Sequence, residues 1–144
     1  MALALVLALV VSLVPVRSVK AAGGSIVVST QSELNRALKS GRYSKITLRT
    51  DAEGTIKIKA GEYGDVNLVI DAPNATIRNY AEEKKVYILG AKKFAEYATG
   101  NTISIRADET KFVTAEGAEV KALGVAKEGA NVLLRLCRQP MRRA

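Results

Sequence analysis

The acidic residues are the first candidates for chemistry, because this chain of 144 residues has no histidine. Histidine is the commonest general base and metal ligand, so an acid–base reaction would need carboxylates beside an arginine or lysine. The pair nearest to that requirement is Asp71 and Arg78. We interpret Asp71, in "IDAPNA", as a turn residue that accepts backbone N–H groups, and Arg78 as an outward residue of the next strand. The pattern therefore predicts no catalytic residue, cofactor or metal site.

The remaining reactive side chains do not gather into a site. Cys137 is the only cysteine, so it cannot form an internal disulfide, and no histidine can activate it as a nucleophile. The glycines are scattered as turn residues and form no phosphate-binding loop. The aspartates fall at turns or on different faces: Asp51, Asp65, Asp71 and Asp108.

A binding surface is the stronger functional candidate. If the isoleucines of two neighbouring strands point inward, Tyr80 and Tyr87 point outward, near Arg78 and Lys85. These four residues are candidate contacts for an anionic glycan. The alternative is that the two tyrosines are ordinary strand residues, since aromatic side chains favour strands.

The first segment, "MALALVLALVVSLVPVRSVKAAGG", predicts export. Its apolar run ends at Val16, which is shorter than the roughly 20 residues that a bilayer-spanning helix needs. Val19 and Ala21 occupy the small-residue positions before a signal-peptidase cut. We therefore expect residues 1–21 to be a signal peptide, cleaved before Ala22, and the protein to be secreted or held at the cell surface, in contact with a membrane only during export.

Two alternatives to this leader stay open. A signal peptide normally opens with lysine or arginine, and only Met1 and Ala2 precede the apolar run. Met1 could thus be internal, with the true start upstream. The segment could also be an uncleaved anchor helix.

The net charge of +8 is concentrated at the two ends. Of 22 basic residues, Arg17 and Lys20 precede the predicted cut, and four more lie in the last ten positions. The body from Ala22 to Ala130 keeps 16 basic against 14 acidic residues. A body so nearly balanced argues against a nucleic-acid partner. The four late basic residues are Arg135, Arg138, Arg142 and Arg143.

One helix is predicted, near residues 31–40, in "STQSELNRALKSG". Thr30 and Glu33 form a capping-box pattern, and Gly41 supplies a left-handed stop. A narrow apolar edge at helical spacing must lie against strands. That edge consists of Leu34, Ala37 and Leu38.

After this helix, apolar residues alternate in short strands that recur about every ten residues. An antiparallel sandwich would also suit this spacing, but a slide of 20 residues superposes the apolar series, as expected for stacked coils. The same slide stacks Lys45, Asp65 and Lys85 on an outer face, with opposite charges adjacent. The inward series are Ile46, Val66 and Val86; Leu48, Leu68 and Ile88; and Ile58, Ile77 and Tyr97.

The pattern from "STQSELNRALKSG" through "KITLRT", "TIKIKAG", "VNLVIDAPNATIRN" and "KKVYIL" resembles right-handed parallel β-helix proteins of the pectin-lyase-like superfamily, in particular small exported repeat proteins of Gram-positive bacteria. The resemblance covers roughly Ser25 to Val132. It implies an all-β fold: a short right-handed parallel β-helix over residues 22–130, covered at its first coil by the amphipathic helix.

The last segment, residues 131–144, is an atypical Arg-rich tail. It reads either as a truncated or frame-shifted end or as a basic tail that binds acidic polymer or membrane surface. Because it offers neither a capping helix nor a polar last coil, we expect self-association through an open C-terminal coil.

The expected function is that of an exported, non-catalytic β-helical module. It would serve a bacterial cell-surface or extracellular protein as a scaffold or as a weak binding surface for polysaccharide or cell-wall polymer. The alternative is a fragment of a pectin-lyase-like carbohydrate-active enzyme, a polysaccharide lyase or hydrolase. An enzyme would show acidic and basic side chains clustered on one outer face.

Overall fold

The structure, a computed structural model, describes residues 23–125 and 131–136. The predicted cleavage residues Val19, Ala21 and Ala22, and most of the Arg-rich tail, lie outside these ranges. The elements are β1 (Gly24–Val28), α2 (Gln31–Ser40), β2 (Tyr43–Arg49), β3 (Gly54–Ile58), β4 (Asn67–Asn79), β5 (Lys85–Glu96), β6 (Asn101–Ile105), β7 (Glu109–Thr114), β8 (Val120–Val125) and β9 (Asn131–Arg135).

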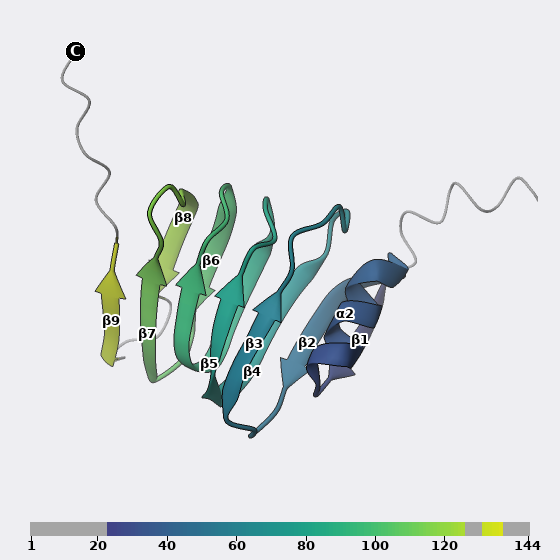
Figure 1. Cartoon of the computed structure of the whole chain (residues 1–144), viewed down its shortest axis with the longest axis horizontal. Helices are drawn as coiled ribbons and strands as arrows, with labels where there is room; N and C mark the ends of the chain where they lie inside the picture. Colours follow the sequence, from purple (N-terminus) through teal and green to yellow (C-terminus); the bar gives the residue numbers. More distant parts are fainter. Residues whose placement is uncertain (1–22, 126–130, 137–144) are drawn as a thin grey trace, which may run out of the picture.

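All pairings between the described strands are parallel. The chain winds into a parallel β-solenoid of about five turns, with β1 and α2 at one end and β9 at the other (Figure 1). This confirms the predicted stacked coils and excludes the antiparallel sandwich.

Each complete turn contributes to two strand faces. The first face has the order β1-β2-β4-β5-β6-β8. The second face runs from β3 through the later halves of β4 and β5 to β7 and β9. Strands β4 and β5 belong to both faces because they turn a corner, where their register shifts after Ile70 and again between Ala72 and Thr76.

The core consists of columns of apolar side chains that stack from turn to turn. On the second face, the Phe94 and Phe112 rings stack with centroids 5.7 Å apart. Ile56 and Leu123 are half-buried, and the other members of the two columns are buried. The first-face column is Ile46, Leu68, Val86, Ile103 and Leu123, and the second-face column is Ile56, Ile77, Phe94 and Phe112.

The predicted repeat length is right on average, but the predicted register is wrong in the second turn. Ile46 stacks on Leu68, not on Val66. The spacing from Ile46 to Leu68 is 22 residues, whereas the spacing from Leu68 to Val86 is 18. The cause is the long turn between β3 and β4, which takes up two more residues than a uniform repeat allows.

The outer charge column and the third inward series are wrong for a similar reason. Asn67, not Asp65, lies between Lys45 and Lys85. Ile58 stacks on Asn79, which in turn stacks on Glu96. The sequence pattern placed Tyr97 in the column of Ile58, but Glu96 occupies that position and Tyr97 is the next residue. Ile77 stacks on Ile56 instead.

The helix α2 has its predicted limits. The Thr30 hydroxyl accepts a hydrogen bond from the Glu33 N–H at 3.2 Å, and Gly41 ends the helix with a φ of 64°. The Glu33 carboxylate accepts the Ser29 N–H at 2.8 Å, so the capping box is displaced by one residue. This bond lowers the pKa of Glu33. As expected, the buried edge of α2 consists of Leu34, Ala37 and Leu38.

At the C-terminal end, the inward columns stop at exposed side chains. Leu134 stacks on Phe112 but is 42% exposed, because no described strand follows β9. Val125, which ends a first-face column, and Leu136 are also exposed. The described residues therefore end in an open apolar cross-section.

Candidate functional site

A hollow of about 370 Å³ lies on the outer surface of the first face. The side chains that line it come from β2, β4, β5 and the residue after β6, in three neighbouring columns. Because alternate residues of a strand point outward, each strand presents one or two of these side chains. They are Lys45, Asn67, Val69, Tyr87, Leu89 and Arg106.

Tyr87 and Arg106 form the polar side of this hollow. The Arg106 guanidinium lies over the Tyr87 ring, 5.1 Å from its centroid. A cation at this distance is attracted to the ring face. The contact orients the guanidinium beside the hollow, and Lys45 adds a second positive charge at the rim.

Val69 and Leu89 form the apolar side. Val69 lies directly beside Tyr87 in the ladder and is 8% exposed, whereas Leu89 is 41% exposed. The Asn67 amide stands between Lys45 and Lys85 in the adjacent column. The hollow thus combines an apolar strip, an amide, a phenol and two cations, which suits a small ligand with an apolar face, hydroxyl groups and negative charge.

The four predicted glycan contacts do not form one patch. Tyr87 and Lys85 are on the first face, where Tyr87 lines the hollow and Lys85 lies in the neighbouring column. Arg78 and Tyr80 belong to the second face. The sequence indicated the outward direction of these residues, but it did not show that the corner of β4 separates the two pairs.

Tyr80 has a partner that the sequence analysis did not assign to it. Its ring stacks on that of Tyr97, with centroids 4.8 Å apart and planes 15° apart. Tyr97 is 41% exposed. Each ring therefore covers one face of the other.

Asp71 is paired with Arg49, not with Arg78. The Arg49 Nε donates to Asp71 Oδ2 at 3.2 Å between neighbouring strands. The interpretation of Asp71 as a turn residue with Arg78 on the next strand is wrong: both residues belong to β4, whose corner after Ile70 turns Arg78 onto the other face. Within the described ranges, no three Asp, Glu or Cys residues are grouped to hold a metal ion.

A buried polar cluster lies where the second face turns into the next coil. Asn79, Glu96 and Asn101 are all 0% exposed. The Asn79 Nδ2 donates to both carboxylate oxygens of Glu96 at 3.1 Å, and the Ala98 N–H donates to Glu96 at 2.9 Å. Burial raises the pKa of Glu96. The cluster is closed to solvent, and its side chains bond backbone groups of the turns. We therefore assign it a structural role and no ligand.

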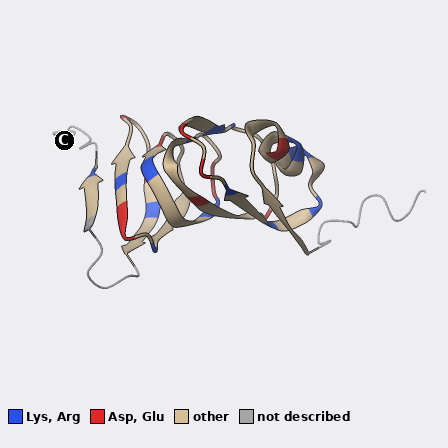
Figure 2. Ribbon diagram, turned by 90° about the horizontal axis from the view of Figure 1, so that it is seen from below, with Lys and Arg blue, Asp and Glu red and all other residues tan. Residues whose placement is uncertain are grey.

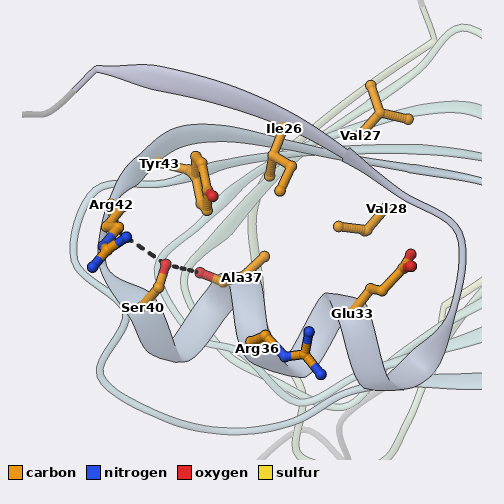
Figure 3. A pocket seen from close by; sticks show the side chains of 9 residues that line it. All are labelled: Ile26, Val27, Val28, Glu33, Arg36, Ala37, Ser40, Arg42 and Tyr43. Atoms are coloured by element: carbon orange, nitrogen blue, oxygen red, sulfur yellow. Dashed lines mark hydrogen bonds between the residues drawn. The ribbon is translucent and has the colours of Figure 1, made fainter.

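A larger hollow, of about 570 Å³, opens at the N-terminal end between β1 and α2 (Figure 3). Ile26, Val28 and Tyr43 reach into it from the strands, while Arg42 lies at one end. Since Ile26 and Val28 stack on Ile46 and Leu48, this hollow is the open end of the core columns. It contains none of the predicted site residues.

No protein-family model, curated protein or solved structure matches this chain. The pectin-lyase-like resemblance therefore stays a prediction from the sequence pattern. Among the described residues, no helix has both the length and the apolar character needed to cross a bilayer.

Proposed function

We propose that this protein is a non-catalytic β-solenoid module of an exported bacterial surface or extracellular protein, and that the first-face hollow binds an anionic glycan weakly. The observation that carries the proposal is the Arg106 guanidinium held over the Tyr87 ring beside exposed Leu89. A sugar ring has apolar C–H faces and hydroxyl edges, so it can use both sides of such a hollow.

The charge on the first face favours an acidic sugar. Outward cations from several strands lie around the hollow. In the first-face segments of the described strands the one carboxylate is Asp71, which is already paired with Arg49. A carboxylate on the ligand would find unpaired positive charge rather than repulsion. The other outward cations of this face are Lys45, Lys85, Arg106 and Lys121.

Titration with a short galacturonate oligosaccharide, such as a trimer, tests this site. We expect Arg106→Gln to weaken binding about tenfold, which corresponds to about 1.4 kcal/mol, and Tyr87→Phe to weaken it less. The control is Arg36→Gln on α2, which makes the same charge change away from the hollow. Equal affinities for the Arg106 and Arg36 variants would count against the proposal.

A lyase assay tests the non-catalytic part of the proposal. Purified protein with Ca²⁺ and polygalacturonate should give no rise in the ultraviolet absorbance that unsaturated products cause. A rise that Asp71→Ala abolishes would favour the carbohydrate-active enzyme and place its site at the Asp71–Arg49 pair.

Export rests on the apolar leader and the small residues before the predicted cut. N-terminal sequencing of secreted material should begin at Ala22. Recovery of a membrane-bound protein that still carries Met1 would contradict the proposal.

A further inference from the structure

The first strands of the two faces differ at their outer edges. On the second face, the Gln31 side-chain amide makes two hydrogen bonds to the Lys57 backbone and so occupies the outer edge of β3. On the first face, β1 pairs only with β2 among the described strands, and its other edge has no strand partner there. An unpaired edge is a template on which another chain can add a strand.

The β1 strand lacks two common devices that block such an edge. Its sequence, "GSIVV", contains neither a charged residue nor a proline. Val27 is 58% exposed and points away from α2 (Figure 3). The strand therefore presents an unpaired backbone edge beside an exposed β-branched side chain, which suits pairing with a further strand.

The hollow between β1 and α2, which we call the N-terminal hollow, lies beside this edge (Figure 3). Ile26 and Val28 reach into it, and they stack on Ile46 and Leu48 of β2. A strand added to β1 would continue these columns with two side chains that lie two residues apart. Ligand pockets measure about 300 to 1,000 Å³, so a hollow of about 570 Å³ has room for both side chains.

The N-terminal end of the solenoid is basic (Figure 2). Over β1, α2 and the turn to β2, the basic residues are Arg36, Lys39 and Arg42, and the one acidic residue is Glu33. The Glu33 carboxylate already accepts the Ser29 N–H at 2.8 Å and the Ser29 hydroxyl at 3.2 Å. Arg36 and Arg42 line the N-terminal hollow, so acidic side chains on an added strand would be attracted to it.

We propose that the open edge of β1 binds an extended segment of another polypeptide by strand addition. The segment has two apolar side chains two residues apart, flanked by acidic side chains. Hydrogen bonds to the β1 backbone supply affinity, the N-terminal hollow selects the apolar side chains, and Arg36 and Arg42 select the acidic ones. This site shares no residue with the first-face hollow and does not depend on glycan binding there.

Charge argues against the protein's own segments as the occupant. Residues 1–22, which precede β1, include Arg17 and Lys20 but no Asp or Glu. In a second copy, the other described strands with a free edge are β8 and β9, and they contain Lys121 and Arg135 but no carboxylate. Either segment would bring like charges together at Arg36 and Arg42.

Fluorescence anisotropy of a labelled peptide, ETVTVTE, with the purified full chain tests the proposal. The peptide reads the same in both directions, so its side-chain pattern suits parallel and antiparallel addition. Three control peptides leave the protein unchanged: KTVTVTK reverses the charge, ETSTSTE removes the apolar side chains, and the third carries N-methyl groups on its central threonine and the preceding valine. Successive residues of a strand direct their N–H groups to opposite sides, so one methyl group must block a bond to β1. Each control should bind at least about tenfold more weakly.

The matching protein variant is Arg36→Gln/Arg42→Gln, which alters two exposed side chains. We expect it to bind ETVTVTE at least about tenfold more weakly. The control is Arg78→Gln/Lys92→Gln, which removes the same charge from exposed positions of β4 and β5. This control, and Arg106→Gln at the first-face hollow, should bind the peptide nearly as the unmodified protein does.

Hydrogen exchange locates the bound peptide. Amide hydrogens of β1 should exchange more slowly when ETVTVTE is present, while those of β8 and β9 keep their rates. The proposal fails if the peptide binds without slowing β1, if the two charge variants lose affinity equally, or if KTVTVTK binds as well as ETVTVTE. Slow exchange in β1 that appears on raising the protein concentration alone would assign the edge to a second copy and also overturn the proposal.

Discussion

The side-chain amide of Gln31 makes the two hydrogen bonds to the Lys57 backbone that a neighbouring strand would otherwise make. The Lys57 N–H donates to Gln31 Oε1 at 2.7 Å, and Gln31 Nε2 donates to the Lys57 C=O at 2.7 Å. A third bond, from Nε2 to Asn35 Oδ1 at 3.0 Å, holds the amide on α2. Because β3 is the first strand of the second face, the amide closes its open edge and discourages pairing with another chain.

Replacing Gln31 should therefore weaken the N-terminal end. Gln31→Ala removes two hydrogen bonds to the strand, and we expect a loss of about 1 to 2 kcal/mol in the free energy of unfolding. Gln31→Glu keeps the acceptor for the Lys57 N–H but sets a carboxylate against the Lys57 C=O, so it should also destabilise. Urea denaturation measures both, with Ser32→Ala as the control; a Gln31→Ala protein as stable as the control would contradict this role.

The core register gives a second prediction. Leu68 is 1% exposed and stacks between Ile46 and Val86, whereas its neighbour Asn67 is exposed. Leu68→Asp would bury an unpaired charge and cost several kcal/mol, enough to unfold a domain of ordinary stability. Asn67→Asp should be nearly neutral. Circular dichroism during thermal unfolding compares the two, and equal tolerance would mean that the register is wrong.

Glu96 predicts an unusual pH dependence. Its pKa is raised above the ordinary value of 4.5 because burial disfavours the ionised carboxylate. The folded state then binds its proton more tightly than the unfolded state, so this group contributes most stability below pH 4.5 and loses it as pH rises through the folded pKa. Stability should therefore increase on acidification from neutral pH towards about 4.5.

Below that range Glu33 acts in the opposite direction. Its pKa is lowered, so its cap contributes stability above 4.5 that is lost as pH falls through its folded pKa.

Glu96→Gln should flatten the rise in stability between neutral pH and pH 5, because Gln cannot ionise but can still accept the Ala98 N–H. Urea denaturation midpoints measured between neutral pH and pH 5 test this prediction. If the pH profile of Glu96→Gln matched that of the unmodified protein, Glu96 would not be the cause of the rise in stability.

The exposed apolar side chains at the C-terminal end of the described residues predict self-association. Leu134 and its neighbour Leu133 form a matched pair, since Leu134 ends an inward column while Leu133 points outward. Static light scattering of the mature protein should show oligomers that Leu134→Lys disperses and Leu133→Lys affects less. A monomer whose mass does not change with protein concentration or salt would show that the end is closed.

The sequence was sufficient for the elements and insufficient for their register. Strand alternation, the cap at Thr30 and the stop at Gly41 are local signals, and they predicted the coils and α2 correctly. Register is not local: Val66 and Leu68 have the same parity and are both buried, so either could stack on Ile46. The length of the intervening turn decided between them, and composition does not indicate it.

The same limit applies to the candidate site. Tyr87 could be recognised as outward from alternation alone, but its contact with Arg106 depends on the offset between β5 and β6. Arg106 therefore had no signal of its own until the columns were known. Glu96 was missed for a different reason: a charged residue beside Tyr97 is typical of a surface, and only the corner geometry brings Asn79 to it.

The long corner strands β4 and β5 also determine how the molecule opens. They are 13 and 12 residues long, and among the described strands they alone join the two faces through ladder hydrogen bonds on both sides of a corner. In a solenoid each coil contacts only its neighbours, so stability varies along the axis. Opening therefore starts at β1, β8 and β9, and amide hydrogens should exchange with solvent slowest in β4 and β5.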